Sequence, residues 1–596
     1  MDNLNLTIIR PFILGLFCLS CTSLQAEDRP NIVLILVDDA GLMDFGGFGG
    51  EAHTPNIDEL AESGVRFGNY HTSPLCAPSR AMLLTGVDNH LTGIGTIPEI
   101  VTATQSEQAG YSMVFVPQIR TVADKLREAG YHTYMTGKWH LGNEGEQLPV
   151  HHGFDRSFSL DASGADNWEQ KSYMPYYENA PWFEGNQAAE LPDDFYSSQF
   201  IVDKMVEYIG TGLTNPGKEA PFFAYLAFQA IHIPVQAPKE FTDHYTGVYK
   251  DGWQQLRQQR MEKGKTLGLI PNQAQLPKPP AFLRDWQTLA AEEKQFFERS
   301  MMVNAGMLEA MDHHIGRLIA HLKSLNKFDD TIFIITSDNG PEFNYPVSSA
   351  VMKAWMYFNG YNASIETLGE RGSLAAIGPE WAIAASTPGD LFKFYATEGG
   401  QRVPLIISGA GEKQTGFHKA LTFVQDITPT ILELANVSVE IQSRGTPMDG
   451  RSLGPLLTGS ALQVYGGEDV IGMEVSGNAS LFKGEYKITF NTLPHGTAKW
   501  GLYHLASDPG EANDLSLKLP ELKADMLADY QDYADRKKVV SMPADFNPVK
   551  QILASLLPRF IKRNVTRIVM GLFALAALTF LCVRLKSSFR GSSSSA

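Results

Sequence analysis

A thiol and a guanidinium stand one helical turn apart in the segment Cys76-Ala-Pro-Ser-Arg80. Pro78 suits only the first turn of a helix and Gly86 suits a helix end, so the spacing predicts a short helix running to Thr85, with Cys76 just before it. Free backbone N–H groups at such an end favour an anion, and Arg80 can offer a fork of donors to a tetrahedral oxyanion there. The segment therefore indicates an anion site. The alternative is a buried structural cysteine beside a surface arginine.

Four oxygen donors follow two apolar, β-branched runs of the chain. They are Asp38 and Asp39 after residues 31–37, and Asp338 and Asn339 after residues 331–337. Such runs are typical of strands buried on both faces of a parallel sheet, and ligand sites lie outside the carboxyl ends of those strands. If the two strands are neighbours, the crowded carboxylates need a cation, and an all-oxygen set selects Ca²⁺ or Mg²⁺ over zinc. Either pair alone would more simply cap a turn. Both pairs together predict a metal site.

Three nitrogen-bearing side chains also follow predicted strands, namely Lys138, His140 and His232. A lone histidine in such a position usually packs and hydrogen-bonds. Two histidines and a lysine that converge on an anion site indicate acid–base chemistry near neutral pH, where imidazole titrates. Lys393 would by default be a solvated surface residue, and the spacing does not say where it reaches.

The elements that must position these residues alternate along the chain. Strands are predicted over 31–37, 65–70, 131–136, 222–229 and 331–337, and helices over 56–64, 122–130, 290–325 and 424–435. This alternation predicts an α/β fold with a large mixed, mostly parallel sheet sandwiched by helices. Residues 341–399 are loop-like, as expected of a site wall. Residues 470–505, including a strand over 481–490, and a helix near 519–536 predict a smaller C-terminal α+β subdomain with an antiparallel sheet.

Both ends of the chain carry apolar segments. Residues 1–26 are expected to be a secretory signal peptide, because Arg10 precedes an apolar run and Leu24-Gln-Ala26 resembles a cleavage site. Residues 567–584 are expected to form a transmembrane anchor, although 16 apolar residues (568–583) span only about 24 Å of a ~30 Å bilayer core. A removable sorting tail or a buried helix are the alternatives. The predicted division is therefore a catalytic domain over 27–435, a subdomain over 436–545, a juxtamembrane linker over 546–566, the anchor, and a tail over 585–596. The product would be periplasmic or at the cell surface, with the membrane as a partner through the C-terminal segment.

Composition and the positions of the cysteines limit the classes of function that the chain could have. The 596 residues are 43% hydrophobic and 19% charged, as in a globular enzyme, and the net charge of −17 argues against nucleic acid as a partner. Cys18 and Cys21 fall in the predicted signal peptide and Cys582 in the predicted anchor. Cys76 is then the only thiol of the exported part, so that part can form no internal disulfide although export favours them. Its presence calls for an explanation.

A series of motifs occurs in the order found in one enzyme family. They are His53-Thr-Pro-Asn-Ile-Asp, the Cys76 segment with Leu84-Thr-Gly, Gly137-Lys-Trp-His-Leu-Gly, Phe228-Gln-Ala-Ile-His232, Ser337-Asp-Asn-Gly and Glu398-Gly-Gly-Gln-Arg-Val-Pro. Over roughly residues 31–515 the chain resembles the type I, formylglycine-dependent sulfatases. Gly86-Val-Asp-Asn-His-Leu-Thr-Gly and Glu380-Trp-Ala-Ile-Ala-Ala-Ser-Thr-Pro are most similar to bacterial arylsulfatases. The resemblance implies an alkaline-phosphatase-like fold.

The resemblance also implies a cofactor set. A maturation enzyme would oxidise Cys76 to formylglycine, whose hydrated aldehyde is the nucleophile. Asp38, Asp39, Asp338 and Asn339, with the modified side chain at 76, would bind Ca²⁺ in preference to Mg²⁺.

The family's division of labour assigns the other roles. Asp338 would take a proton from the hydrate, and His232 would protonate the departing alcohol or phenol while Lys393 helps to hold the sulfate. His140 would take the second hydroxyl proton to release sulfate. Lys138 and Arg80 would hold the hydrate and the sulfate charge.

The expected function is therefore an arylsulfatase-type sulfuric ester hydrolase acting on a small sulfate ester or a sulfated glycan. The alternatives on the same scaffold are a phosphonate or phosphate monoester hydrolase and a carbohydrate sulfatase. A metal-binding protein without activity is a further alternative, which would result if Cys76 stayed unmodified.

Overall fold

The computed structural model describes residues 29–555, apart from 143, 176, 214–219, 410, 412–413 and 544–545, together with the isolated residues 565 and 579. The signal peptide predicted over 1–26, the tail predicted over 585–596 and, apart from residue 579, the anchor predicted over 567–584 therefore lie outside the described residues. None of the helices in the described part combines the length and the apolar character needed to cross a membrane.

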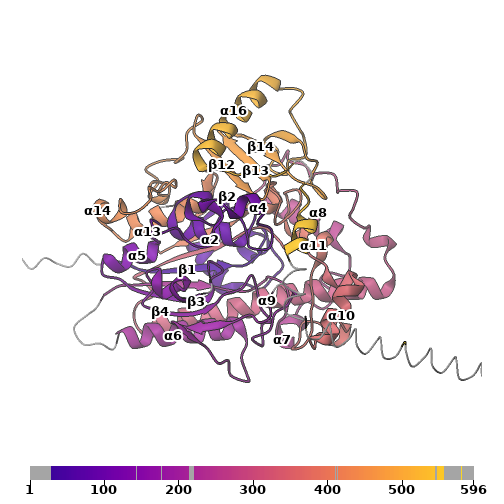
Figure 1. Ribbon diagram of the computed structural model, residues 1–596, viewed down its shortest axis with the longest axis horizontal. Helices are drawn as coiled ribbons and strands as arrows, with labels where there is room; N and C mark the ends of the chain where they lie inside the picture. Colours follow the sequence, from indigo (N-terminus) through magenta and orange to yellow (C-terminus); the bar gives the residue numbers. More distant parts are fainter. Residues whose placement is uncertain are drawn as a thin grey trace, which may run out of the picture.

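An 11-stranded mixed sheet forms the centre of the molecule (Figure 1). Its strands are β1 (Asn31–Val37), β2 (Val65–His71), β3 (His132–Lys138), β4 (Arg156–Leu160), β5 (Trp182–Glu184), β6 (Gln187–Ala188), β7 (Phe222–Ala227), β8 (Thr331–Ser337), β9 (Arg402–Ser408), β10 (Gly416–His418) and β11 (Thr422–Phe423). Their order is β10-β2-β9-β8-β1-β7-β3-β4-β5-β6, and β11 pairs with β2. The central strands β8, β1, β7, β3 and β4 are parallel, whereas β9 runs antiparallel to both β2 and β8. The predicted mixed, mostly parallel sheet is confirmed.

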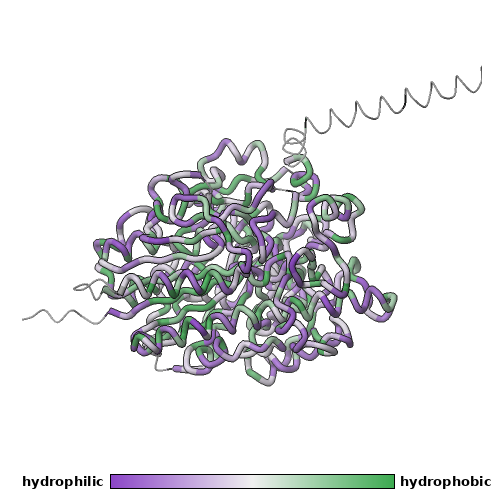
Figure 2. The backbone as a smooth tube through the Cα atoms, turned by 90° about the horizontal axis from the view of Figure 1, so that it is seen from below, coloured by the Kyte–Doolittle hydropathy of each residue, from purple (hydrophilic) through white to green (hydrophobic). Residues whose placement is uncertain are grey.

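Helices cover both faces of this sheet, which explains why β1 is apolar at every position after Asn31. Alternate side chains of a strand point to opposite faces, and all seven residues of β1 are buried. Val33, Ile35 and Val37 pack in one core with α6 (Ser197–Leu213) and α9 (Ala291–Ser324), below the sheet in Figure 1. Ile32, Leu34 and Leu36 pack in a second core with α2 (Cys76–Thr85), α5 (Val122–Glu128) and α13 (Ile427–Leu434) on the other side. The hydrophobic stretches in Figure 2 follow these inner layers.

A separate antiparallel sheet forms the C-terminal subdomain, as predicted. Its strands are β12 (Val470–Val475), β13 (Asn478–Lys483), β14 (Tyr486–Phe490) and β15 (Trp500–His504), and α16 (Pro520–Lys537) packs against them. The single strand expected over 481–490 is wrong, because the chain reverses between β13 and β14. Gly484 there has a φ of +57°, a conformation that glycine adopts without steric cost. The reversal joins two strands into a hairpin.

Buried ion pairs attach this subdomain to the part of the molecule that holds the large sheet. Lys487 of β14 lies 2.8 Å from Glu398, the first residue of α12 (Glu398–Gln401), and 2.9 Å from Glu511. His71 of β2 contacts the same Glu398 carboxylate at 3.0 Å. Ion pairs thus join the small sheet to β2 and to α12, the helix that directly precedes β9.

The composition of the stretch over 341–399 predicted loops. The structure shows that this stretch also contains helices. These include α10 (Ala350–Phe358) and α11 (Gly378–Ala385), and in α11 every residue except Pro379 is buried. Trp381 of α11 donates a hydrogen bond from its indole to the Phe297 carbonyl of α9 at 2.9 Å. Its packing against the long helix gives the loops around Lys393 a fixed base.

Candidate active site

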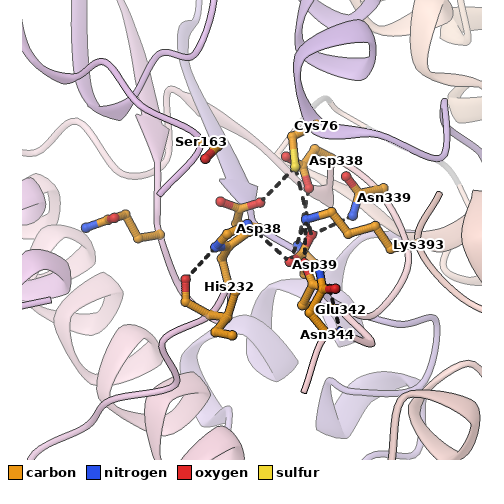
Figure 3. A network of polar contacts seen from close by, with 12 residues as sticks. Asp38, Asp39, Cys76, Ser163, His232, Asp338, Asn339, Glu342, Asn344 and Lys393 are labelled. Carbon is orange, nitrogen blue, oxygen red and sulfur yellow. Dashed lines mark hydrogen bonds and ion pairs between the residues drawn. The ribbon is translucent and has the colours of Figure 1, made fainter. Parts of the chain in front are cut away.

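The ends of β1 and β8 place the four predicted oxygen donors together. The two strands are parallel neighbours in register from Asn31–Thr331 to Val37–Ser337, so the residues that follow them meet at one edge. The Asn339 amide donates to Asp39 Oδ1 at 2.6 Å, and the Asp39 backbone N–H donates to Asp338 Oδ1 at 3.2 Å. Figure 3 shows these side chains gathered around one point.

Cys76 faces these carboxylates from the start of α2. The helix begins at Cys76 itself rather than beyond it, because the Ser79 N–H already bonds to the Leu75 carbonyl at 3.1 Å. Gly86 ends the helix with a φ of +71°, as predicted. The Cys76 Sγ lies 3.6 Å from Asp38 Oδ1 and 4.0 Å from Asp39 Oδ1. Burial, together with the charge of Asp338, holds the pKa of the thiol well above its usual value, so it is protonated and a poor nucleophile in this form.

Two buried cations balance the acidic side chains behind Cys76. Lys138 Nζ contacts Asp38 Oδ2 at 2.5 Å. Arg80 donates from Nε and Nη2 to Asp338 Oδ2 at 3.0 and 2.8 Å, and from Nη1 to the Lys138 carbonyl at 2.8 Å. Burial by itself raises the pKa of Asp38, but Lys138 and Arg80 outweigh it and the pKa is lowered. Arg80 is 0% exposed, so it is no surface arginine.

Lys393 reaches the same cluster from a loop far along the chain. Its Nζ lies 2.7 and 2.9 Å from the two carboxylate oxygens of Asp39 and 3.3 Å from Glu342 Oε2, and it is buried rather than solvated. Glu342 was not predicted. Its other oxygen accepts the backbone N–H groups of Phe343 and Asn344 at 2.9 and 2.8 Å. Its place four residues after Asp338 was the only available signal.

The two histidines lie at the same cleft in neutral form. His232 Nδ1 donates to the Ile233 carbonyl at 2.7 Å, which leaves Nε2 to face Asp39 Oδ2 at 3.8 Å. Burial and then Lys393 lower the pKa of His232 well below its usual value, and burial with Lys138 and Arg80 does the same for His140. Both ring nitrogens of His140 are buried without a hydrogen-bond partner in the part of the chain described. Buried polar groups in folded proteins nearly always have a hydrogen-bond partner, so these two nitrogens are candidates for contact with a ligand.

The donor set fits a hard divalent cation. Burial, Asp38 and Glu342 raise the pKa of Asp39 well above its usual value although Lys393 opposes them, so a further positive charge would relieve this carboxylate. Asn339 Oδ1 is buried and accepts no hydrogen bond from any described residue. Ligand atoms of Asp38, Asp39, Cys76 and His232 lie within 4.8 Å of one another. Carboxylate and amide oxygens in this number favour Ca²⁺ or Mg²⁺.

An open cleft of about 170 Å³ lies above the cluster. Its floor is polar, formed by Cys76, His140, His232, Glu342 and Lys393, whereas most of its wall is apolar, with Leu75, Ile97, Ile100, Phe343, Phe394 and Tyr395. A larger cavity of about 990 Å³, lined by residues such as Asn69, Arg402 and Glu485, shares no lining residue with it. The smaller cleft is the candidate active site because the titratable groups converge there.

Comparison with known proteins agrees with this geometry. Residues 30–437 match the family described as Sulfatase. An uncharacterized sulfatase of Schizosaccharomyces pombe is 35% identical over 547 residues, which cover 88% of this chain and 96% of that protein. An arylsulfatase of Klebsiella aerogenes is 33% identical over 424 residues, covering 69% of this chain and 88% of that protein. The solved structure of Ps i-CgsB in complex with k-i-k-neocarrahexaose has the same fold, with a TM-score of 0.61 at 22% identity, and the match covers 90% of this chain and 99% of that one.

Proposed function

Because this chain belongs to the sulfatase family, whose members hydrolyse sulfuric esters, we propose that it is a formylglycine-dependent, arylsulfatase-type hydrolase. It would release inorganic sulfate and an alcohol or phenol. The observation that carries the proposal is the position of Cys76, buried at the start of α2 and within 4.0 Å of Asp38 and Asp39. The name of the Klebsiella aerogenes relative supports the arylsulfatase assignment.

Two groups would complete the site. Asp38, Asp39, Asp338 and Asn339 would hold a divalent cation, which we propose is Ca²⁺. Formylglycine at position 76 would supply the attacking oxygen as a hydrated aldehyde, and the cation would polarise the sulfate oxygens.

The buried cations of the chain would orient the reacting groups. Arg80 binds Asp338 Oδ2 through two donors and so fixes this carboxylate beside residue 76, where it can accept a proton. Lys138, held by Asp38 and by the end of β3, would stabilise negative charge on the oxygens at residue 76. Lys393 would exchange part of its contact with Asp39 for a sulfate oxygen. Preorganised charges of this kind stabilise a transition state without reorganisation.

The histidines would move the protons. His232 would protonate the departing oxygen, which requires its protonated form. An anionic sulfate ester in the cleft favours that form, because a nearby negative charge raises the pKa of an imidazole. His140, whose ring nitrogens have no partner among the described residues, would accept the second proton when sulfate is released.

The partners follow from this chemistry. The substrate would be a small sulfate ester, with a sulfated glycan as the alternative, and a maturation enzyme would convert Cys76. We also propose export and a C-terminal membrane anchor on the sequence alone, since both segments, apart from residue 579, lie outside the described residues.

The test compares esters of the same phenol. Protein matured in its own host is assayed side by side on phenyl sulfate, phenyl phosphate and a phenyl phosphonate, with sulfate release measured by ion chromatography and Cys76→Ala as the control. Phenyl sulfate as the best substrate, with no turnover by the variant, supports the proposal. Faster phosphate or phosphonate ester hydrolysis favours the alternative hydrolase. No turnover by protein that still binds metal favours the inactive metal-binding protein.

A further inference from the structure

A short helical segment near the end of the described chain packs beside the active-site cleft. Residues 548–555 are helical and lie apart from α16, in yellow in Figure 1. The Gln551 side-chain amide donates to the Val101 carbonyl at 2.8 Å, and the Ser555 hydroxyl donates to the Glu99 carbonyl at 3.0 Å. Both acceptors belong to the loop over 97–101, which itself lines the cleft through Ile97, Glu99 and Ile100. We call residues 548–555 the C-terminal wall.

One face of the C-terminal wall contributes directly to the cleft. Pro548, Val549 and Ile552 line the same cavity as Cys76 and His232. Residues three and four positions apart lie on one side of a helix, which is why these three share a face. Ile552 also packs against the main hydrophobic core, whereas Val549 is 53% exposed at the cleft. Leu553 does not line the cavity and is 61% exposed.

The surroundings of the C-terminal wall are chiefly apolar. Ile97, Ile100, Phe394 and Pro494 line the cleft above its charged floor. Above the floor, the polar side chains that line the cleft are Glu99, which accepts a hydrogen bond from the Tyr177 hydroxyl, Ser163, Tyr173, Asn344, Tyr395 and His495. A sugar ring needs a hydrogen-bond partner for most of its hydroxyls, because a buried unpaired polar group is costly. An apolar leaving group has no such requirement.

The volume of the cleft limits the size of the leaving group that it can hold. A dry apolar cavity of about 150 Å³ holds one benzene molecule, so the cleft of about 170 Å³ is filled by a single ring above the charged floor. A substituent on the ring would extend past Val549 and Ile552 toward the open side.

We propose that the C-terminal wall is a specificity element that favours sulfate esters whose leaving group carries an apolar extension. Pro548, Val549 and Ile552 would contact that extension and contribute to its binding. The inference rests on the proposed sulfate ester hydrolysis, since it concerns the same cleft. The wall lies beyond residues 30–437, the part that matches the family, so the preference would be a feature of this chain's C-terminal region.

The test uses a homologous series in the full-length matured protein. The kcat/KM is measured on phenyl sulfate, para-butylphenyl sulfate and para-hexylphenyl sulfate. For each methylene that is fully buried, kcat/KM should rise by up to about fourfold, chiefly through a lower KM. The first variant is Ile552→Ala, which shortens the side chain. The second is Val549→Thr, which conserves the shape of the side chain and so tests the proposal even if Ile552→Ala does not fold. Leu553→Ala, on the same helical segment but outside the cleft, is the matched control.

The wall is supported if both variants lower kcat/KM for the hexyl ester by about three- to tenfold more than they lower it for phenyl sulfate, and if the control leaves the whole series unchanged. A series without chain-length dependence in the wild type, or one that the variants do not alter, overturns the inference and leaves the proposed hydrolysis intact. The binding of para-alkylbenzenesulfonates, measured by calorimetry on Cys76→Ala, separates the two claims. If no ester is turned over, the proposed function fails. The C-terminal wall is then judged by sulfonate binding alone: affinity that rises with chain length supports it, and affinity that does not change with chain length overturns it.

Discussion

Replacing Arg80 by methionine is the sharpest perturbation of the buried cluster. It removes three hydrogen bonds, two of them to Asp338 Oδ2 at 3.0 and 2.8 Å, from a guanidinium that is 0% exposed. Methionine keeps an unbranched side chain of similar length. Asp338, 1% exposed, would stay buried and lose its charged partner.

The magnitude follows from that loss. Breaking a buried ion pair by removing one partner costs about 3–5 kcal/mol, since the other charge stays buried without compensation. Removing both charges is much cheaper, because neither is then left alone. Arg80→Met combined with Asp338→Asn should therefore destabilise the protein by about 1–3 kcal/mol less than the sum of the single changes. Arg451→Met breaks an exposed ion pair with Asp469 and should cost less than about 1 kcal/mol.

The assay is equilibrium unfolding in urea with EDTA present, so that no divalent cation contributes. Circular dichroism and tryptophan fluorescence are followed together, because a free energy of unfolding is defined only where the two transitions coincide. Arg451→Met combined with Asp338→Asn is the control pair and should be additive. The ion pair between Arg80 and Asp338 would be refuted by either of two results. One is a decrease of less than about 1 kcal/mol in the free energy of unfolding for Arg80→Met, and the other is additivity of Arg80→Met with Asp338→Asn.

Three further predictions concern proton transfer, the metal and pH. His232→Ala should lower kcat by about 10²–10⁴-fold for an alkyl sulfate. The loss should be far smaller for nitrophenyl sulfate, because its leaving group needs no proton. Equal losses of kcat for the two esters in steady-state assays would contradict the role of His232 as the proton donor. Chelation with EDTA should abolish turnover, and added Ca²⁺ should restore more of it than Mg²⁺ does; undiminished activity in EDTA would argue against a metal. Burial disfavours the charged form of His90, but the hydrogen bonds that its ring donates to Asp88 and Glu474 outweigh burial and raise its pKa to about 9. That stabilisation is complete below the unfolded pKa of about 6.5 and is lost as pH rises through about 9, so urea unfolding should show a decline of about 3 kcal/mol over that range. The decline should be absent in His90→Gln, and its persistence there would rule out this histidine as the cause.

The parts of the site that the sequence predicts are those tied to strand ends. Asp38 follows the apolar run over 32–37, and Asp338 follows the apolar run over 332–335 after two small polar residues. Such runs are typical of strands covered on both faces, so the edge at which the two aspartates meet could be inferred. The ion pair between Arg80 and Asp338 could not be inferred from the sequence, because it depends on how α2 is placed above the sheet. The same holds for Lys393, which a separate loop brings to Asp39.

Two errors have clear physical causes. The continuous β-rich run over 481–490 contains Gly484, whose positive φ lets the chain reverse, and composition alone does not locate such a reversal. Two helices of the aromatic and glycine-rich stretch over 341–399, α10 and α11, were not predicted. In α11 every residue except Pro379 is buried, so this helix lacks an amphipathic pattern. Glu342 was missed because its function depends on a contact with Lys393, 51 positions away in the sequence.

The measurement that tests the central claim most directly is the mass of the tryptic peptide Phe67–Arg80, taken from protein purified out of its native host. The account predicts the loss of one sulfur and two hydrogens and the gain of one oxygen at residue 76, which is the change from cysteine to formylglycine. An unmodified cysteine in protein that hydrolyses sulfate esters would contradict it.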